Sequence, residues 1–99
     1  MPRNGMRPVH PGEVLLNDYL VPLGLSVRAL SAALKVSSSR MGRVVNGRGA
    51  IDAEIALRLE RYFGAEAIGW LNLQQAYDLR VAEIGHKHAI DLAVLPRTI

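Results

Sequence analysis

Hydrophobic residues recur along this chain at helical spacing, in segments separated by Pro, Gly or Ser. The first segment starts at about Pro11, which suits the first turn of a helix, and Val14, Leu15 and Tyr19 follow three or four residues apart. Pro22 and Gly24 are residues at which helices commonly end. The pattern therefore predicts a first helix between residue 11 and this break.

Two short helices are predicted next. Ser26 is placed to cap a helix whose apolar residues Leu30, Ala33 and Leu34 point inward. Ser37 is placed to cap another, with core positions at Met41, Val44 and Val45 and an end at Asn46 and Gly47. Because only a tight turn separates them, the region of about residues 26–46 reads as a helix-turn-helix.

The C-terminal half of the chain predicts one medium and one long helix. Asp52 caps the first of these, Gly64 ends it, and its inner face is formed by Ile55, Ala56, Leu59 and Phe63. A longer pattern covers about residues 66–84, where apolar residues lie on more than one side. A helix of this kind needs two neighbours, and we expect its own domain to be one and a second copy of the chain to be the other. The residues assigned to that dimer interface are Trp70, Leu73, Tyr77 and Val81.

The two ends of the chain are less regular. Residues 1–9 mix Pro, Gly and Arg without periodicity and are predicted to form a flexible N-terminal arm. Residues 85–99 fit a strand and a helix equally well and are treated as a C-terminal tail. Between them, residues 10–84 form one predicted domain. The expected fold is all-α, with about five helices, and 99 residues suffice for a single core.

Charge is distributed unevenly along this fold. From Asp18 to Asp52 no carboxylate intervenes, and the same stretch carries Arg28, Lys35, Arg40, Arg43 and Arg48. A basic surface without acids attracts a polyanion, and this one coincides with the predicted helix-turn-helix. We therefore expect this region to contact DNA.

A helical wheel of residues 38–46 places Ser39, Arg43 and Asn46 opposite the core side. Short side chains at the start of such a helix let it enter the major groove, and Arg can form two hydrogen bonds with guanine. Arg43 is the first choice for reading a base, while Arg40 and Arg48 are expected to position the protein on the phosphates. The predicted DNA-binding residues are Arg28, Ser37, Ser38, Ser39, Arg40, Arg43, Asn46 and Arg48.

Some of these polar and charged residues also have a purely structural interpretation. A serine at a helix start is usually a cap, and Arg58 and Arg61 are interpreted as solvated helix charges. His86 and His88 are two residues apart with no third firm ligand, so no metal site or cofactor is predicted.

Composition narrows the functional classes. The chain has no cysteine, which excludes disulfides and fits a reducing cytoplasm, and no apolar stretch approaches the roughly 18 residues of a membrane span. Three scattered histidines and acids placed mainly at caps offer no catalytic constellation. We expect a cytoplasmic protein without membrane contact that is not an enzyme.

Four motifs occur in a specific order: HPGEVLLNDYLVPLGLS (10–26), VVNGRGAI (44–51), ALRLERYFG (56–64) and WLNLQQAYDLRVA (70–82). Together they resemble the HigA-type antitoxins, a branch of the phage-repressor-like helix-turn-helix family. The resemblance implies a homodimer that binds an inverted-repeat operator in its own promoter and neutralises a HigB-like toxin that cuts messenger RNA. The implied partners are therefore double-stranded operator DNA, the toxin and a second copy of the chain.

The chain departs from the phage-repressor pattern at three positions. Val27 replaces a glutamine that braces a phosphate contact in many relatives of this type, and Gly42 interrupts the recognition helix. Gly42 would either allow the helix to approach the DNA backbone closely or simply loosen the helix. Lys35 stands where the turn usually has glycine, so a left-handed backbone there would cost roughly 1 kcal/mol.

Two other functions remain open on the sequence. A stand-alone helix-turn-helix regulator without a toxin would carry the same residues. A protein-interaction module that never binds DNA would explain the apolar last helix, but it would leave the acid-free basic stretch unexplained.

Overall fold

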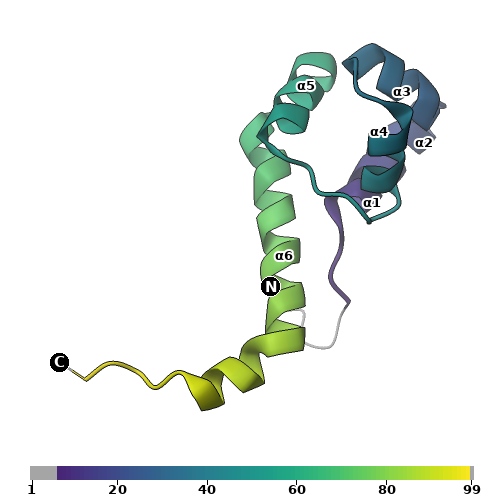
Figure 1. Ribbon diagram of the computed structural model, residues 1–99. Helices are drawn as coiled ribbons and strands as arrows, with labels where there is room; N and C mark the ends of the chain where they lie inside the picture. The colour runs from purple at the N-terminus through teal and green to yellow at the C-terminus, as the bar shows by residue number, and fades with distance from the viewer. Residues whose placement is uncertain (1–6, 99) are drawn as a thin grey trace.

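The computed structural model describes residues 7–98, and every regular element in that range is a helix (Figure 1). Residues 1–6, which make up most of the predicted N-terminal arm, and Ile99 lie outside the described residues. The elements are α1 (Pro11–Leu15), η1 (Leu16–Leu20), α2 (Val21–Leu23), α3 (Val27–Leu34), α4 (Ser38–Val45), α5 (Ala53–Phe63) and α6 (Ala67–Ala93). The all-α expectation is confirmed.

The first predicted helix is present but contains a wider turn. α1, η1 and α2 follow one another directly, and η1 is π-helical, with the Val21 N–H donating to the Leu16 carbonyl. Pro22 has no N–H and its ring crowds the preceding turn, which favours such a local widening. The helix therefore continues to Leu23 and ends at Gly24, whose φ of 62° is left-handed.

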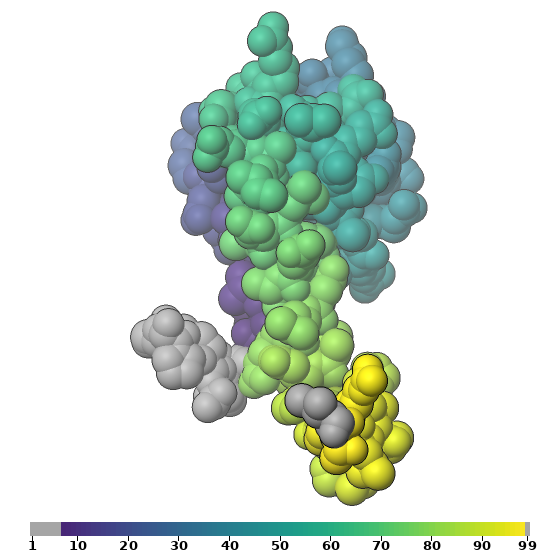
Figure 2. All heavy atoms as spheres, turned by 90° about the vertical axis from the view of Figure 1, so that its left-hand side faces the viewer, coloured from purple at the N-terminus to yellow at the C-terminus, as the bar shows by residue number. Residues whose placement is uncertain are grey.

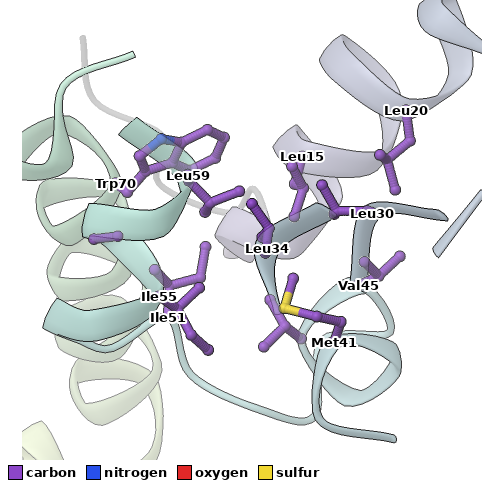
Figure 3. Packing of buried hydrophobic residues seen from close by; sticks show 12 residues of the cluster. Leu15, Leu20, Leu30, Leu34, Met41, Val45, Ile51, Ile55, Leu59 and Trp70 are labelled. Carbon is purple, nitrogen blue, oxygen red and sulfur yellow. The ribbon is translucent and has the colours of Figure 1, made fainter. Parts of the chain in front are cut away.

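The core lies where α1, α3, α4, α5 and α6 meet, and its side chains point toward one another from all of these elements (Figure 3). It comprises Leu15, Leu20, Leu30, Leu34, Met41, Val44, Val45, Ile51, Ile55, Ala56, Leu59 and Trp70. Each large aliphatic side chain buried here stabilises the fold by about 1.5–3 kcal/mol. Within this shared core, α4 packs against α1 and α3.

One inward position was predicted wrongly. Ala33 is exposed, and Ser31 is buried instead between Leu30 and Leu34 on the inner side of α3. Burial of this hydroxyl is possible because Ser31 Oγ donates a hydrogen bond of 2.8 Å to the Val27 carbonyl.

α6 is longer than its predicted counterpart and continues to Ala93, through the first part of the segment treated as a tail. Its N-terminal part packs on α5 and α1, whereas its last turns bend away and project from the rest of the molecule (Figures 1 and 2). Every residue from 81 to 98 is exposed. We call residues 81–93 the distal segment of α6.

Candidate nucleic-acid interface

The helix-turn-helix consists of α3, a three-residue turn and α4. Ser26 Oγ accepts a hydrogen bond of 3.0 Å from the Ala29 N–H, and Ser37 Oγ accepts one of 3.2 Å from the Arg40 N–H, so both predicted caps are confirmed. Lys35 has a φ of 60°, so the turn keeps a left-handed backbone although the residue is not glycine. The local strain is compensated by the core contacts that flank the turn on both sides.

α4 divides into a buried and an exposed side, as its wheel predicts. Met41, Val44 and Val45 are buried. The side chains of Ser38, Ser39, Arg43 and Asn46 are exposed. Short polar residues at the start of the helix and a basic residue one turn later leave this side accessible to a groove.

Arg40 has a partner that its sequence neighbourhood does not suggest. Its guanidinium forms an ion pair with Asp52 Oδ2, while Asp52 Oδ1 accepts a hydrogen bond of 2.9 Å from the Ile55 N–H. Asp52 is thus the predicted cap of α5 and also a counter-charge to the interface. The stretch is free of acids in sequence, but the fold brings one carboxylate to its edge.

The loop after α4 holds Arg48 close to the recognition helix. The Arg43 carbonyl accepts hydrogen bonds from the N–H groups of Arg48, at 2.7 Å, and Gly49, at 3.0 Å. Gly47 has a φ of 76°, which allows the tight reversal that these bonds require. Arg48 is exposed beside α4, and Arg28 and Lys35 are exposed on and just after α3.

α1 supports α4 from behind through its first residues. Gly12 lies directly against α4, because a Cβ atom added to it would come within 1.8 Å of the Val44 carbonyl oxygen. His10 caps α1, because its Nδ1 accepts a hydrogen bond of 2.9 Å from the Gly12 N–H. The imidazole is buried and meets the Tyr77 ring edge-on, with the two ring centroids 4.8 Å apart. Burial lowers the pKa of His10, and a backbone hydrogen bond with Gly49 partly offsets this shift.

Sequence reasoning missed the role of Gln74. This buried side chain of α6 accepts a hydrogen bond of 2.9 Å from the Ile51 N–H through Oε1, and its Nε2 donates one of 2.9 Å to Asp78. It anchors the end of the loop that carries Arg48. A polar residue at a core position of the helical wheel of α6 was the available signal.

Arg58 is also more than a solvated charge. It donates a hydrogen bond of 2.8 Å to the Leu34 carbonyl and pairs with Glu54 at 2.9 Å, so it joins α5 to the C-terminal end of α3. An otherwise unpaired helix-end carbonyl explains the contact. Arg61 is exposed, in agreement with its interpretation.

The residues assigned to a dimer interface differ in exposure. Trp70 is only 3% exposed and packs against Tyr19 in the protomer core, with ring centroids 5.3 Å apart. Tyr77 is half-buried, while Leu73 and Val81 are exposed. His86 and His88 lie in the distal segment of α6, where Lys87 pairs with Asp91 at 3.2 Å.

Comparison with known proteins gives relatives that cover most of the chain, although no protein-family model matches it. The chain is 53% identical over 81 residues to virulence-associated protein I of Dichelobacter nodosus, covering 82% of this chain and 75% of that protein. It is 35% identical over 79 residues to antitoxin HigA-1 of Vibrio cholerae, covering 80% and 74%. The solved structure of the Pseudomonas aeruginosa antitoxin HigA with the higBA promoter matches with a TM-score of 0.89 and 38% identity, over 93% of this chain and 100% of that chain.

The chain belongs to the HigA family of helix-turn-helix antitoxins. Other relatives, from Escherichia coli and Haemophilus influenzae, are described as uncharacterized helix-turn-helix transcriptional regulators. The predicted resemblance is confirmed. Within residues 7–98, no helix is both long and apolar enough to cross a membrane.

Proposed function

We propose that this HigA-family chain is an antitoxin and autorepressor that binds an inverted-repeat operator in its own promoter as a homodimer. The observation that carries the proposal is α4 itself, a helix fixed on its inner side by the core and presenting Ser39, Arg43 and Asn46 outward. The P. aeruginosa HigA with its promoter supports the same use of the fold. The interface consists of Arg28, Ser37, Ser38, Ser39, Arg40, Arg43, Asn46 and Arg48.

Each residue has a defined part in this proposal. Arg43 reads a base edge in the major groove, where Ser38 and Ser39 permit close approach. Arg28, Arg40 and Arg48 contact phosphates and set the register. Ser37 contributes mainly by capping α4, because its hydroxyl already accepts the Arg40 N–H.

Dimerisation supplies the symmetry of the operator. Leu73, Tyr77 and Val81 follow one another along α6 and meet the same surface of a second copy, while Trp70 supports that surface from within the core. Two α4 helices then enter successive major grooves about one helical turn apart, which requires an inverted repeat.

Neutralisation of a HigB-like toxin that cuts messenger RNA is the second part of the proposal, and family membership supports it. An RNA-cutting enzyme carries basic groups where it binds RNA, and the acids of this chain lie outside the DNA-facing stretch. The proposed location is the cytoplasm, because promoter DNA and messenger RNA are both found there. No catalytic activity is assigned to the chain itself.

The alternative function is a stand-alone regulator of the same fold without a toxin. Relatives described as transcriptional regulators favour it. A neighbouring reading frame for a small basic protein, whose toxicity is relieved by co-expression of this chain, would support the antitoxin. A neighbourhood without such a frame would favour the stand-alone regulator.

The decisive experiment is a salt titration of binding to DNA taken from immediately upstream of the gene, with scrambled DNA of equal length as control. We expect specific binding that weakens steeply with salt, since several Arg and Lys side chains face phosphates. Equal affinity for both DNAs, or none, would overturn the operator proposal.

A further inference from the structure

Arg40 and Asp52 connect the recognition helix to the first turn of α5. Both oxygens of Asp52 are engaged, Oδ1 by the Ile55 N–H and Oδ2 by the Arg40 guanidinium. The two side chains are 38% and 50% exposed, so the pair lies at the surface, beside the outward side of α4.

This ion pair is not required to hold α4 and α5 together. Exposed pairs of this kind contribute little to stability, and an uncharged asparagine caps a helix as well as aspartate does. The connection between the two helices is already fixed by the buried Ile51 and by its hydrogen bond to Gln74. The main consequence of Asp52 at this place is therefore electrostatic.

Arg40 is distinguished from the other cations of the interface by this partner. Within the described residues, Arg43 and Arg48 form no ion pair and are exposed to any approaching phosphate. Arg40 can neutralise a phosphate only by leaving Asp52, and that exchange leaves an uncompensated carboxylate close to the DNA. Such an exchange is favourable only where a phosphate is held in good geometry.

We propose that Asp52 is a specificity-determining residue that acts by holding Arg40. On unrelated DNA, Arg40 stays paired with Asp52, so the neutral pair contributes nothing to affinity. In the operator register, a phosphate replaces Asp52 as the partner of Arg40. The ion pair thus lowers affinity for unrelated DNA and does not raise affinity for the operator. This inference rests on the proposed DNA binding.

The test compares Asp52→Asn with Glu54→Gln on upstream and scrambled DNA. Glu54→Gln removes the same charge from the same turn of α5, but Glu54 pairs with Arg58 instead of Arg40. We expect Asp52→Asn to bind scrambled DNA roughly tenfold more tightly, with a slope of log affinity against log salt steeper by about 0.9 per subunit, and so to discriminate less well. Glu54→Gln should change both affinities slightly and by the same factor.

A double-mutant cycle with Arg40→Gln establishes whether Asp52 acts through Arg40. In the Arg40→Gln background, Asp52→Asn removes only a charge, so it should change both affinities by the same factor, as Glu54→Gln does, and should no longer alter discrimination. Asp52→Ser, which also retains a cap, should repeat the result of Asp52→Asn and guards against an effect of folding. An equal response to Asp52→Asn with and without Arg40, or a response equal to that of Glu54→Gln while Arg40 is present, would overturn the inference.

Failure of this inference is distinguishable from failure of the proposed function. A wild-type protein that prefers its upstream DNA, combined with unchanged discrimination in Asp52→Asn, rejects only the role of Asp52. A wild-type protein without any such preference rejects operator binding itself.

Discussion

The body of the protein, residues 10–77, and the distal segment of α6 use the same apolar residue types in opposite ways. Leu15, Ile55 and Leu59 in the body are fully buried, whereas Ile84 is 60% and Leu92 is 72% exposed. The body buries its hydrophobic residues against five of its own helices. The distal segment has backbone hydrogen bonds and surface ion pairs, but no core of its own.

The body can therefore fold by its own packing, whereas the distal segment depends on a neighbour. A helical segment of this length is marginally stable in isolation, so the distal segment relies on continuity with the packed part of α6 or on a second molecule. Substitutions of residues packed in the body should therefore change stability, while substitutions along the exposed side of α6 should change assembly.

The largest expected effect comes from Gly12→Ala in the body. The added Cβ would meet the backbone of Val44, which cannot move without separating α1 from α4. We expect a loss of about 3 kcal/mol or more of unfolding free energy, measured by denaturant titration.

Gly42→Ala is the matched control, because its Cβ meets no atom within 4 Å. It lies within α4 and should raise stability by about 1 kcal/mol. Equal stability of the two variants would show that α1 does not pack on α4 as closely as described. Weaker operator binding by Gly42→Ala would favour close approach to the DNA backbone as the reason for this glycine.

The next effect concerns α6. The double variant Leu73→Asp with Val81→Asp should be monomeric by sedimentation and keep the unfolding free energy of the body, because both side chains are exposed in the protomer. Loss of linkage between two half-sites should lower operator affinity by roughly 100-fold or more. Leu57→Asp, at a more exposed position on α5, is the control and should remain dimeric. A double variant that stays dimeric would place the interface elsewhere.

A smaller effect is expected at the DNA-facing side of the body. Arg43→Ala should cost about 1–3 kcal/mol of operator binding, concentrated at one base pair, with no change in stability since the side chain is exposed. Binding to a set of single-base operator variants measures this. Arg61→Ala, exposed on α5, should bind like wild type. A uniform loss across all sequences would make Arg43 a phosphate contact.

The smallest effect should appear as a pH dependence of the body's stability. The pKa of His10 is lowered mainly by burial, and the opposing charges that face it are Asp78 and Glu13. The unfolded chain takes up a proton near pH 6.5, before the folded protein does, so stability is full above that pH and declines as the pH falls toward the lowered pKa. Denaturant titrations between pH 8 and 5 measure this slope.

His10→Asn removes the titrating group and keeps a residue able to cap α1, so its stability should vary less over the same range. His88→Asn, in the distal segment, should retain the full slope of the wild-type protein. A slope unaffected by His10→Asn would assign the pH dependence to other groups.

Local features of the fold were predictable because their causes are local. Ser26, Ser37 and Asp52 cap the helices at which their positions predicted caps, since a cap depends on residues two or three places away. The buried stripe of α4 follows from the same short-range rules, whereas the left-handed backbone at Lys35 does not, because a lysine does not favour it.

Contacts between distant residues were not predictable in this way. The pairing of Arg40 with Asp52, the hydrogen bond from Ile51 to Gln74 and the approach of Gly12 to Val44 join residues 12 or more positions apart. The assignment of Arg58 as a solvated charge was wrong for the same reason, because its acceptor lies on another helix. The conformation beyond Ile84 was ambiguous in the sequence, because the apolar residues there fit the spacing of a strand and that of a helix equally well.

The order of apolar and capping residues was enough to define the helices, the helix-turn-helix and the outward side of α4, because each depends on neighbours within about one helical turn. The packing of the helices against one another decided which of the outward cations has a counter-charge and which apolar residues of α6 remain uncovered. Those properties arise only when distant segments meet, since ion pairing and burial depend on distance in space and not on separation along the chain.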